Sequence, residues 1–306
     1  MTEIKSAALE LGTERIRKLL VQYAVPAIIA MTASSLYNMV DSIFIGHGVG
    51  PLAISGLALT FPLMNLAAAF GSLVGVGAAT LISMRLGQRD YETAQRVLGN
   101  VLVLNLIIGI AFGLVALLFL DSILYFFGAS EATIGYAREY MTVILLGNVV
   151  THMYLGLNSV LRASGHPRKS MYATINTVVI NTILDPLFIF GFGWGIRGAA
   201  IATVVGQCVA AVITGISGFR RPPKPVVMRK YVRQIYRLGY PSIFMQMLYT
   251  VYIMALNMIL AGFSDDAVTV LGLYYKLQSF FFIPLNGLQT CIVPVSYTHL
   301  TLPTIA

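Results

Sequence analysis

The sequence predicts an all-α polytopic membrane protein. Of its 306 residues, 57% are hydrophobic and only 10% are charged, whereas a typical soluble domain has about 25% charged residues. The mean hydropathy is +0.80, and the apolar residues fall into long runs that reach the roughly 20 residues a membrane-spanning helix needs. These observations exclude a soluble globular domain. They also make the lipid bilayer an expected partner.

Eight apolar spans follow a polar N-terminal arm of residues 1–15. The connections between them are short and rich in Gly, Ser and Pro, so neighbouring helices are expected to be antiparallel. The first six spans form a predicted six-helix lobe over residues 1–219, and the last two begin a second lobe over residues 231–295. The expected spans are Leu19–Gly46, Pro51–Met84, Ala94–Leu120, Tyr140–Leu161, Met171–Phe192, Gly198–Phe219, Ile235–Gly262 and Ala267–Val295.

The basic residues predict the orientation of the chain. All but three of the 20 Lys and Arg residues fall on one set of helix ends, and the exceptions are Arg138, Arg197 and Lys276. Positively charged loops are retained on the cytoplasmic side of a membrane. The N-terminus is therefore expected to be cytoplasmic.

Residues 220–230 form the longest connection, and it is the one rich in both Pro and charge. Such a stretch predicts a cytoplasmic loop between two lobes. A weak internal repeat crosses it with a spacing of 215 or 216 residues, and an even number of helices in each half would make the halves parallel repeats. The matched pairs are Pro26 with Pro241, Tyr37 with Tyr252, Gly56 with Gly272, and Gly71 with Gly287.

The repeat leads us to expect a C-terminally truncated chain. Six helices before the loop predict six after it, and hence a parent protein of twelve helices. Residues 296–306 are short and rich in Thr, and we expect them to be a non-native tail excluded from the fold. The alternative is an eight-helix protein with a polar tail.

An aspartate inside the fifth span is the first candidate functional group. Asp185 lies within the apolar run Met171–Phe192, and Asn181 lies four residues before it, on the same face of a helix. Ionisable residues within membrane spans are costly and usually mark a functional site. Pro186 cannot donate a backbone hydrogen bond and is expected to interrupt the helix, as often happens at transporter binding sites.

A second aspartate, Asp41, lies in the first span about one and a half turns from its end at Gly46. Asn38 is three residues away on the same face, next to Tyr37. The predicted topology places Asp41 and Asp185 in the same, outward half of the membrane. We therefore expect the two acids to form one ion-coupling site.

The coupling ion remains open between Na⁺ and H⁺. A pair of neighbouring acids removed from water can exchange a proton, whereas hard oxygen ligands equally suit Na⁺. The alternative interpretation is that the Asn and Asp side chains only join helices through hydrogen bonds. For Asn181 alone we prefer that alternative, and for Asn181 together with Asp185 we prefer the ion site.

Further polar residues lie within the apolar spans. Asn158 lies in the fourth span, and Thr203 and Gln207 lie one turn apart in the sixth; each alone is expected to be a helix-packing contact. Lys276, in the eighth span, is expected either to contact substrate, to pair with an acid or to reach the membrane surface. The candidates for the substrate cavity are Tyr37, Asn38, Gln207, Gln246 and Lys276, and the candidate hinges are Pro26 and Pro186.

Other classes of function find little support in the sequence. The four histidines have no metal-ligand spacing, no Ser lies in a nucleophile elbow, and the basic loops are not interleaved with aromatic residues as in nucleic-acid sites. Cys208 and Cys291 lie in apolar runs, which argues against a disulfide framework. We expect no enzyme activity, no cofactor and no nucleic-acid partner.

Three motifs resemble the multidrug and toxic compound extrusion (MATE) family. The resemblance covers residues 15–295 and is closest to the bacterial branch with multidrug efflux and DNA-damage-inducible members. The motifs are Pro26 followed by Tyr37-Asn38-Met39-Val40-Asp41-Ser42-Ile43-Phe44-Ile45-Gly46, then Leu161-Arg162-Ala163-Ser164-Gly165, and then Asn181-Thr182-Ile183-Leu184-Asp185-Pro186.

The resemblance implies twelve helices in two lobes, alternating access, and export of organic cations in exchange for Na⁺ or H⁺. It implies a monomer in the inner membrane of a bacterium. In similar proteins a cation site in the first lobe uses an acid of helix 1, an Asn and an acid of helix 5 and a hydroxyl of helix 6. These correspond to Asp41, Asn181, Asp185 and Thr203, a possible Na⁺ site, with Asn158 in support.

The sequence departs from the family pattern in two respects. Some members carry a glutamate in the seventh helix, but the corresponding Pro241–Gln246 contains no acid. Helices 9 to 12 do not occur in this sequence, so we expect the chain alone not to transport. Two alternative functions are a lipid-linked oligosaccharide flippase, which would need several basic residues lining its cavity, and a non-transporting membrane receptor or enzyme.

Overall fold

The computed structural model describes residues 14–218, 225–261, 263, 274, 278, 281–290, 292 and 295–296. Residues 1–13 of the expected N-terminal arm, Lys276, most of the eighth span and nearly all of the expected tail lie outside the described residues. Within the described part the chain is helical and contains no strand.

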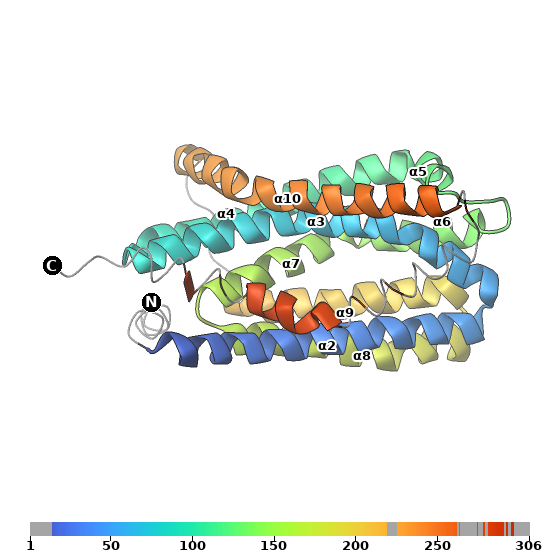
Figure 1. Ribbon diagram of the computed structural model, residues 1–306, viewed down its shortest axis with the longest axis horizontal. Coiled ribbons are helices and arrows are strands. Elements are labelled where there is room, and N and C mark those ends of the chain that lie inside the picture. Colours follow the sequence, from blue (N-terminus) through green and yellow to red (C-terminus); the bar gives the residue numbers. More distant parts are fainter. Residues whose placement is uncertain are drawn as a thin grey trace.

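The helices form an elongated bundle and run roughly along its long axis (Figure 1). Among the described residues, five helices are long and apolar enough to cross a membrane, and the bent pair α6 and α7 makes up to six. Helix α10 is not among them, although it covers most of the expected seventh span. The elements are α2 (Ile16–Gly48), α3 (Pro51–Gly87), α4 (Tyr91–Leu118), α5 (Leu120–Phe126), α6 (Ile134–Leu146), α7 (Asn148–Ala163), α8 (Pro167–Pro186), η1 (Leu187–Gly191), α9 (Gly195–Gly218) and α10 (Pro225–Ala261).

The fourth span differs from the single helix Tyr140–Leu161 that the sequence predicts. It consists of α6 and α7, which meet at Gly147 with a bend of 58°. A Cβ atom at Gly147 would lie 2.6 Å from a methyl carbon of Val204 in α9. The break therefore lies where α9 packs too closely for a side chain. Hydropathy alone does not reveal such a contact.

The two predicted proline hinges behave differently. Pro186 is the last residue of α8, and a π-helical turn, Leu187–Gly191, follows it. Loss of the proline N–H explains this departure from regular α-helix. Pro26, by contrast, lies inside α2, and the helix continues through it without a break.

Part of the predicted loop 220–230 is helical. Helix α10 already begins at Pro225. Proline favours the first turn of a helix because its missing N–H has no partner there in any case. The charged residues Arg229 and Lys230 therefore belong to α10.

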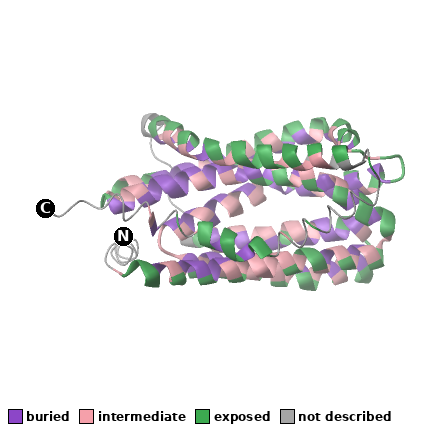
Figure 2. Ribbon diagram, viewed as in Figure 1, coloured by how far each residue is buried: buried purple, intermediate pink, exposed green. Residues whose placement is uncertain are grey.

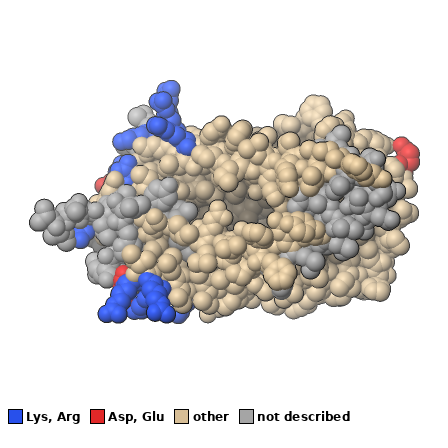
Figure 3. Space-filling model, in the orientation of Figure 1, with Lys and Arg blue, Asp and Glu red and all other residues tan. Residues whose placement is uncertain are grey.

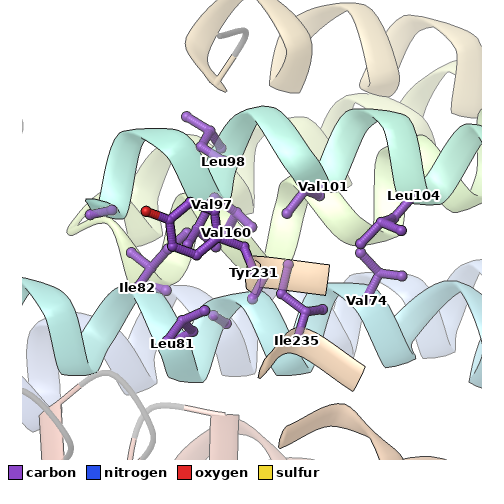
Figure 4. Packing of buried hydrophobic residues seen from close by; sticks show 14 of the residues in the cluster. Val74, Leu81, Ile82, Val97, Leu98, Val101, Leu104, Val160, Tyr231 and Ile235 are labelled. Atoms are coloured by element: carbon purple, nitrogen blue, oxygen red, sulfur yellow. The ribbon is translucent and has the colours of Figure 1, made fainter. Parts of the chain in front are cut away.

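Helix α3 forms the centre of the bundle. Its most apolar window is 67% buried, against 39% or less for the other four long apolar helices, and it packs on α4, α7 and α10. Figure 4 shows Ile82 of α3 near Val97 of α4, and Val74 of α3 near Leu104 of α4. Tyr231 and Ile235 of α10 enter the same cluster (Figure 4).

Glycines allow α3 and α10 to pack with their backbones nearly touching. A Cβ on Gly77 would clash with the carbonyl oxygen of Ile235, and one on Gly239 would clash with that of Leu73. Gly287 also packs closely, in this case against the side chain of Ile28 in α2. Residues 281–290 therefore lie against α2.

Exposed apolar side chains lie along α10, and charged side chains lie at the two ends of the bundle. Figure 2 shows much of α10 exposed; its exposed side chains include Phe244, Met245 and Tyr249. On the face shown in Figure 3, Lys and Arg gather at the end nearest the N-terminus, and the middle of the face is hollowed. At the opposite end, Arg138 forms an ion pair with Asp121.

Substituting Gly77 by Ala should destabilise the bundle. The new methyl group would meet a backbone carbonyl, which cannot rotate away, so we expect a loss of about 1–3 kcal/mol, typical of overpacking. Gly135→Ala is the matched control, because open space surrounds Gly135 in α6. Denaturant titration in mixed micelles measures both variants. Equal stabilities would contradict the close α3–α10 contact.

Candidate functional site

Two buried acids meet where α2 and α8 pack along each other. Asp41 of α2 is 7% exposed, and Asp185 of α8 is fully buried. The two carboxyl groups are close enough for a hydrogen bond between them when one is protonated. The structure therefore brings together the two aspartates that the sequence predicts as partners.

Several oxygen atoms of this site lack a hydrogen-bond donor in the described part of the chain. They are Oδ1 of Asp41, Oδ1 of Asn181 and both carboxyl oxygens of Asp185. Buried polar atoms are nearly always satisfied, and a buried carboxylate without a partner is especially costly. A cation bound among these four oxygens, or a proton together with water, would satisfy them.

Hydroxyl groups from three helices border the acids. The Tyr37 hydroxyl lies 3.4 Å from Oγ1 of Thr203 in α9 and next to the Asp185 carboxyl. Tyr140 of α6 is 3% exposed, and its hydroxyl also contacts Thr203. The predicted residue Thr203 thus lies at the site, with two tyrosines beside it.

Sequence reasoning missed Tyr140. It lies at the first position of the expected fourth span and is preceded by Arg138 and Glu139, so the pattern indicates a membrane boundary. The break at Gly147 moves α6 against α9 and brings the tyrosine to the interior. The sequence signal that could have identified Tyr140 is an aromatic hydroxyl in the outward half of a predicted span.

The position of Asn181 depends on a glycine in the neighbouring helix. Asn181 is 2% exposed, and its Oδ1 lies where a Cβ on Gly206 of α9 would be. Only a residue without a side chain allows α9 to approach so closely. The missing side chain of Gly206 therefore leaves the space that the Asn181 amide occupies between α8 and α9.

The remaining predicted member, Asn158, has other partners. Its amide nitrogen donates to the Ser170 carbonyl over 3.3 Å and to Thr174 Oγ1 over 3.4 Å, and its oxygen accepts from Arg162 over 2.8 Å. The Ser170 hydroxyl also donates to this oxygen. Asn158 belongs to this separate network, which joins α7 to the start of α8, and none of these partners is one of the two acids.

The predicted cavity residues are dispersed. Asn38 and Pro26 line a cavity of about 300 Å³ between α2, α7 and α8. Gln207 accepts a hydrogen bond from Thr151, Gln246 is exposed on α10, and Lys276 lies outside the described residues. The same cavity is also lined by Arg162, a basic residue of the kind that the flippase alternative requires in greater number.

The donor set of the site determines its chemistry. It offers carboxylate, amide and hydroxyl oxygens, which suit a proton or a hard monovalent cation. Among the described residues, no group of three or more His, Cys, Asp or Glu side chains could hold a metal ion. Such a set of oxygen atoms is chemically suited to reversible binding of a single small cation.

Comparison with known proteins identifies the family. The MatE family model matches residues 26–187, a range that contains both aspartates. The chain belongs to the MATE family of efflux transporters. Curated relatives include the Multidrug export protein MepA of Staphylococcus saprophyticus, 30% identical over 283 residues, and MepA of Staphylococcus aureus, 30% identical over 286 residues. These matches cover 90% and 91% of this chain, and the chain spans 63% of the length of either relative.

Solved MATE structures share the fold. A crystal structure of MATE in complex with MaL6 matches with a TM-score of 0.88 and 26% identity, covering 96% of this chain and 68% of that one. A MOP superfamily transporter from Pyrococcus furiosus matches with a TM-score of 0.87 and 26% identity over the same shares of the two chains. The all-α polytopic fold predicted from the sequence is thereby confirmed.

Replacing Gly206 by Ala should weaken cation binding without altering any polar group. The added methyl would displace the Asn181 amide, and loss of one oxygen ligand should lower the affinity about 10-fold, equivalent to about 1.4 kcal/mol. Titrations with NaCl and with acid measure the binding of Na⁺ and H⁺. Gly215→Ala, in open space on the same helix, is the control, and equal affinities in the two variants would contradict the assignment.

Proposed function

We propose that this MATE protein is a secondary active antiporter that exports amphipathic, cationic organic compounds in exchange for Na⁺ or H⁺. The observation that carries the proposal is the buried pair Asp41 and Asp185, three of whose four carboxyl oxygens lack a hydrogen-bond donor in the described part of the chain. A stable buried anion pair needs a compensating positive charge. An inward-moving cation can supply it.

In the proposed cycle, the ion enters between α2 and α8 and draws both carboxyl groups and the Asn181 amide around itself. The helices then change shape at their prolines: at Pro26, which removes one backbone hydrogen bond from the otherwise continuous α2, and at Pro186, where a π-helical turn follows α8. This rearrangement favours release of the substrate to the outside. Antiport requires that ion and substrate bind to different states.

The exposed face of α10 suits flat, lipophilic substrates. Phe244, Met245 and Tyr249 of α10 are exposed, and Met side chains adapt to ligands of varied shape. The curated relatives are named for multidrug export, which supports the same substrate class here. The flippase alternative would require several basic residues lining the cavity, and the lining described here includes one, Arg162.

The membrane topology is part of the proposal. The basic end of the bundle, with Arg17, Lys18, Arg85, Arg168 and Lys169, would face the cytoplasm under the positive-inside rule. The end with Arg138 would face outward, which places the ion site in the outward half. The staphylococcal relatives support the cytoplasmic membrane of a bacterium. A monomeric, non-enzymatic transporter is the simplest assembly compatible with these features.

Competition between ion and substrate tests the proposal at equilibrium. The protein is placed in nanodiscs, and binding of a fluorescent cationic dye is followed by anisotropy. NaCl at constant ionic strength, or a lower pH, should weaken dye binding, because coupling between two sites is reciprocal. In Asp185→Asn the dye should still bind, but its affinity should no longer respond to the ion.

Two controls make this experiment decisive. Choline chloride in place of NaCl accounts for ionic strength, and Asp121→Asn alters an exposed acid at the end of the bundle. Dye binding that is insensitive to both Na⁺ and H⁺ in the unaltered protein would contradict the proposed antiport.

A further inference from the structure

The start of α10 has an exposed basic face. Arg229, Arg233 and Arg237 follow one another at intervals of four residues, and all three side chains are exposed, so they project from one side of the helix. The opposite side is buried, since Tyr231 and Ile235 pack in the cluster with α3 and α4. Figure 3 shows a group of Lys and Arg side chains over this part of the molecule. The contact with α3 thus determines the side from which the three arginines project.

The positive charge of this face is not balanced within the described part of the chain. Helix α10 contains no Asp or Glu, and the exposed Lys230 adds a fourth positive charge. None of Arg229, Arg233 and Arg237 forms an ion pair with another described residue. Guanidinium groups match the geometry of phosphate oxygens. A phosphate group from outside the chain can therefore neutralise them.

The spacing of the arginines matches the layer of lipid headgroups. Arg237 lies eight residues after Arg229, which is about 12 Å along the helix axis. The headgroup layer on each side of the hydrocarbon core is about 5–8 Å thick. With Arg229 at the water side, Arg237 reaches the edge of the hydrocarbon core. Tyr236 and Tyr240, which are exposed on the same part of α10, are typical of that boundary.

An apolar cavity adjoins the basic face. Tyr236, the neighbour of Arg237, lines a cavity of about 350 Å³ between α10, α3 and α4, and the other lining residues are apolar. On α4 they include Ile108, Phe112 and Val115, which lie progressively further from the start of that helix. The cavity therefore extends from the arginines toward the middle of the bundle. Its size and its apolar walls suit a hydrocarbon chain.

We propose that this part of the protein binds one anionic phospholipid of the leaflet at the basic end of the bundle. Its phosphate contacts Arg233 and Arg237, and one of its acyl chains occupies the cavity beside Tyr236. A zwitterionic lipid carries a positive charge next to its phosphate and should bind less well, whereas soluble phosphate lacks the chain. The site does not include Asp41 or Asp185, so the proposal does not rest on the proposed antiport.

Quenching of a single tryptophan by brominated lipids tests the proposal. Trp194 is the one tryptophan of the chain, so Trp194→Phe combined with Val115→Trp places the reporter in the cavity wall. The protein is placed in phosphatidylcholine nanodiscs with a fixed fraction of brominated phosphatidylglycerol or of equally brominated phosphatidylcholine. The reporter should show a preference for phosphatidylglycerol of at least about fivefold, the effect of one basic residue near anionic lipid.

Two controls distinguish a site from general attraction to a basic protein. With Ile110→Trp in place of Val115→Trp, the reporter is exposed on α4 outside the cavity, and the two brominated lipids should quench it nearly equally. Arg168→Gln removes an exposed basic residue at the start of α8. It should leave the preference that is measured with Val115→Trp unchanged.

Substitution of the arginines tests the headgroup contact. Arg233→Gln together with Arg237→Gln should abolish the preference, while quenching by brominated phosphatidylcholine stays the same and shows that the cavity persists. Replacing both by Lys should retain part of the preference, and sodium glycerophosphate in solution should not displace the lipid. Equal quenching by both lipids at Val115→Trp, an equal preference at Ile110→Trp, an unchanged preference in the double Gln variant, or displacement by glycerophosphate would overturn the proposal.

Discussion

The interaction on which this structure depends is the meeting of two carboxyl groups away from water. Asp41 and Asp185 lie on helices that pack along each other, and repulsion between two buried carboxylates makes their joint ionisation costly. Helices α2, α8 and α9 supply amide and hydroxyl oxygens around them, but no basic residue is among these neighbours in the described part. A mobile cation can supply the positive charge that no basic side chain supplies at this site.

Close helix packing makes this arrangement possible. The Asn181 amide sits against Gly206, and the helix break at Gly147 brings α6 and Tyr140 against α9. Glycine has the same effect between α3 and α10, where Gly77 and Gly239 let the two helices approach backbone to backbone. In a bilayer, where lipid is as apolar as Leu, close van der Waals packing replaces the hydrophobic effect as the force between helices. Glycine therefore determines where polar groups can meet.

Sequence reasoning reached the fold class and the approximate positions of the long apolar helices of the described part, and it singled out the two acids that the structure places together, because hydropathy and the cost of intramembrane charge act locally along the chain. It placed Asn158 with the acids, whereas its hydrogen bonds join it to Arg162 and Ser170. It also missed Tyr140 and the bend at Gly147. These errors share a cause, since each depends on which faces of non-adjacent helices meet, and a single sequence does not encode that in any periodicity.

The central claim is that Asp41 and Asp185 bind one cation together. A double-mutant cycle tests it most directly, with Na⁺ and H⁺ binding measured by calorimetry for Asp41→Asn, Asp185→Asn and the double variant. If the acids form one site, either single substitution should remove nearly all the binding that the double substitution removes, giving strong non-additivity. Independent, additive losses, or cation binding that persists in the double variant, would contradict the claim.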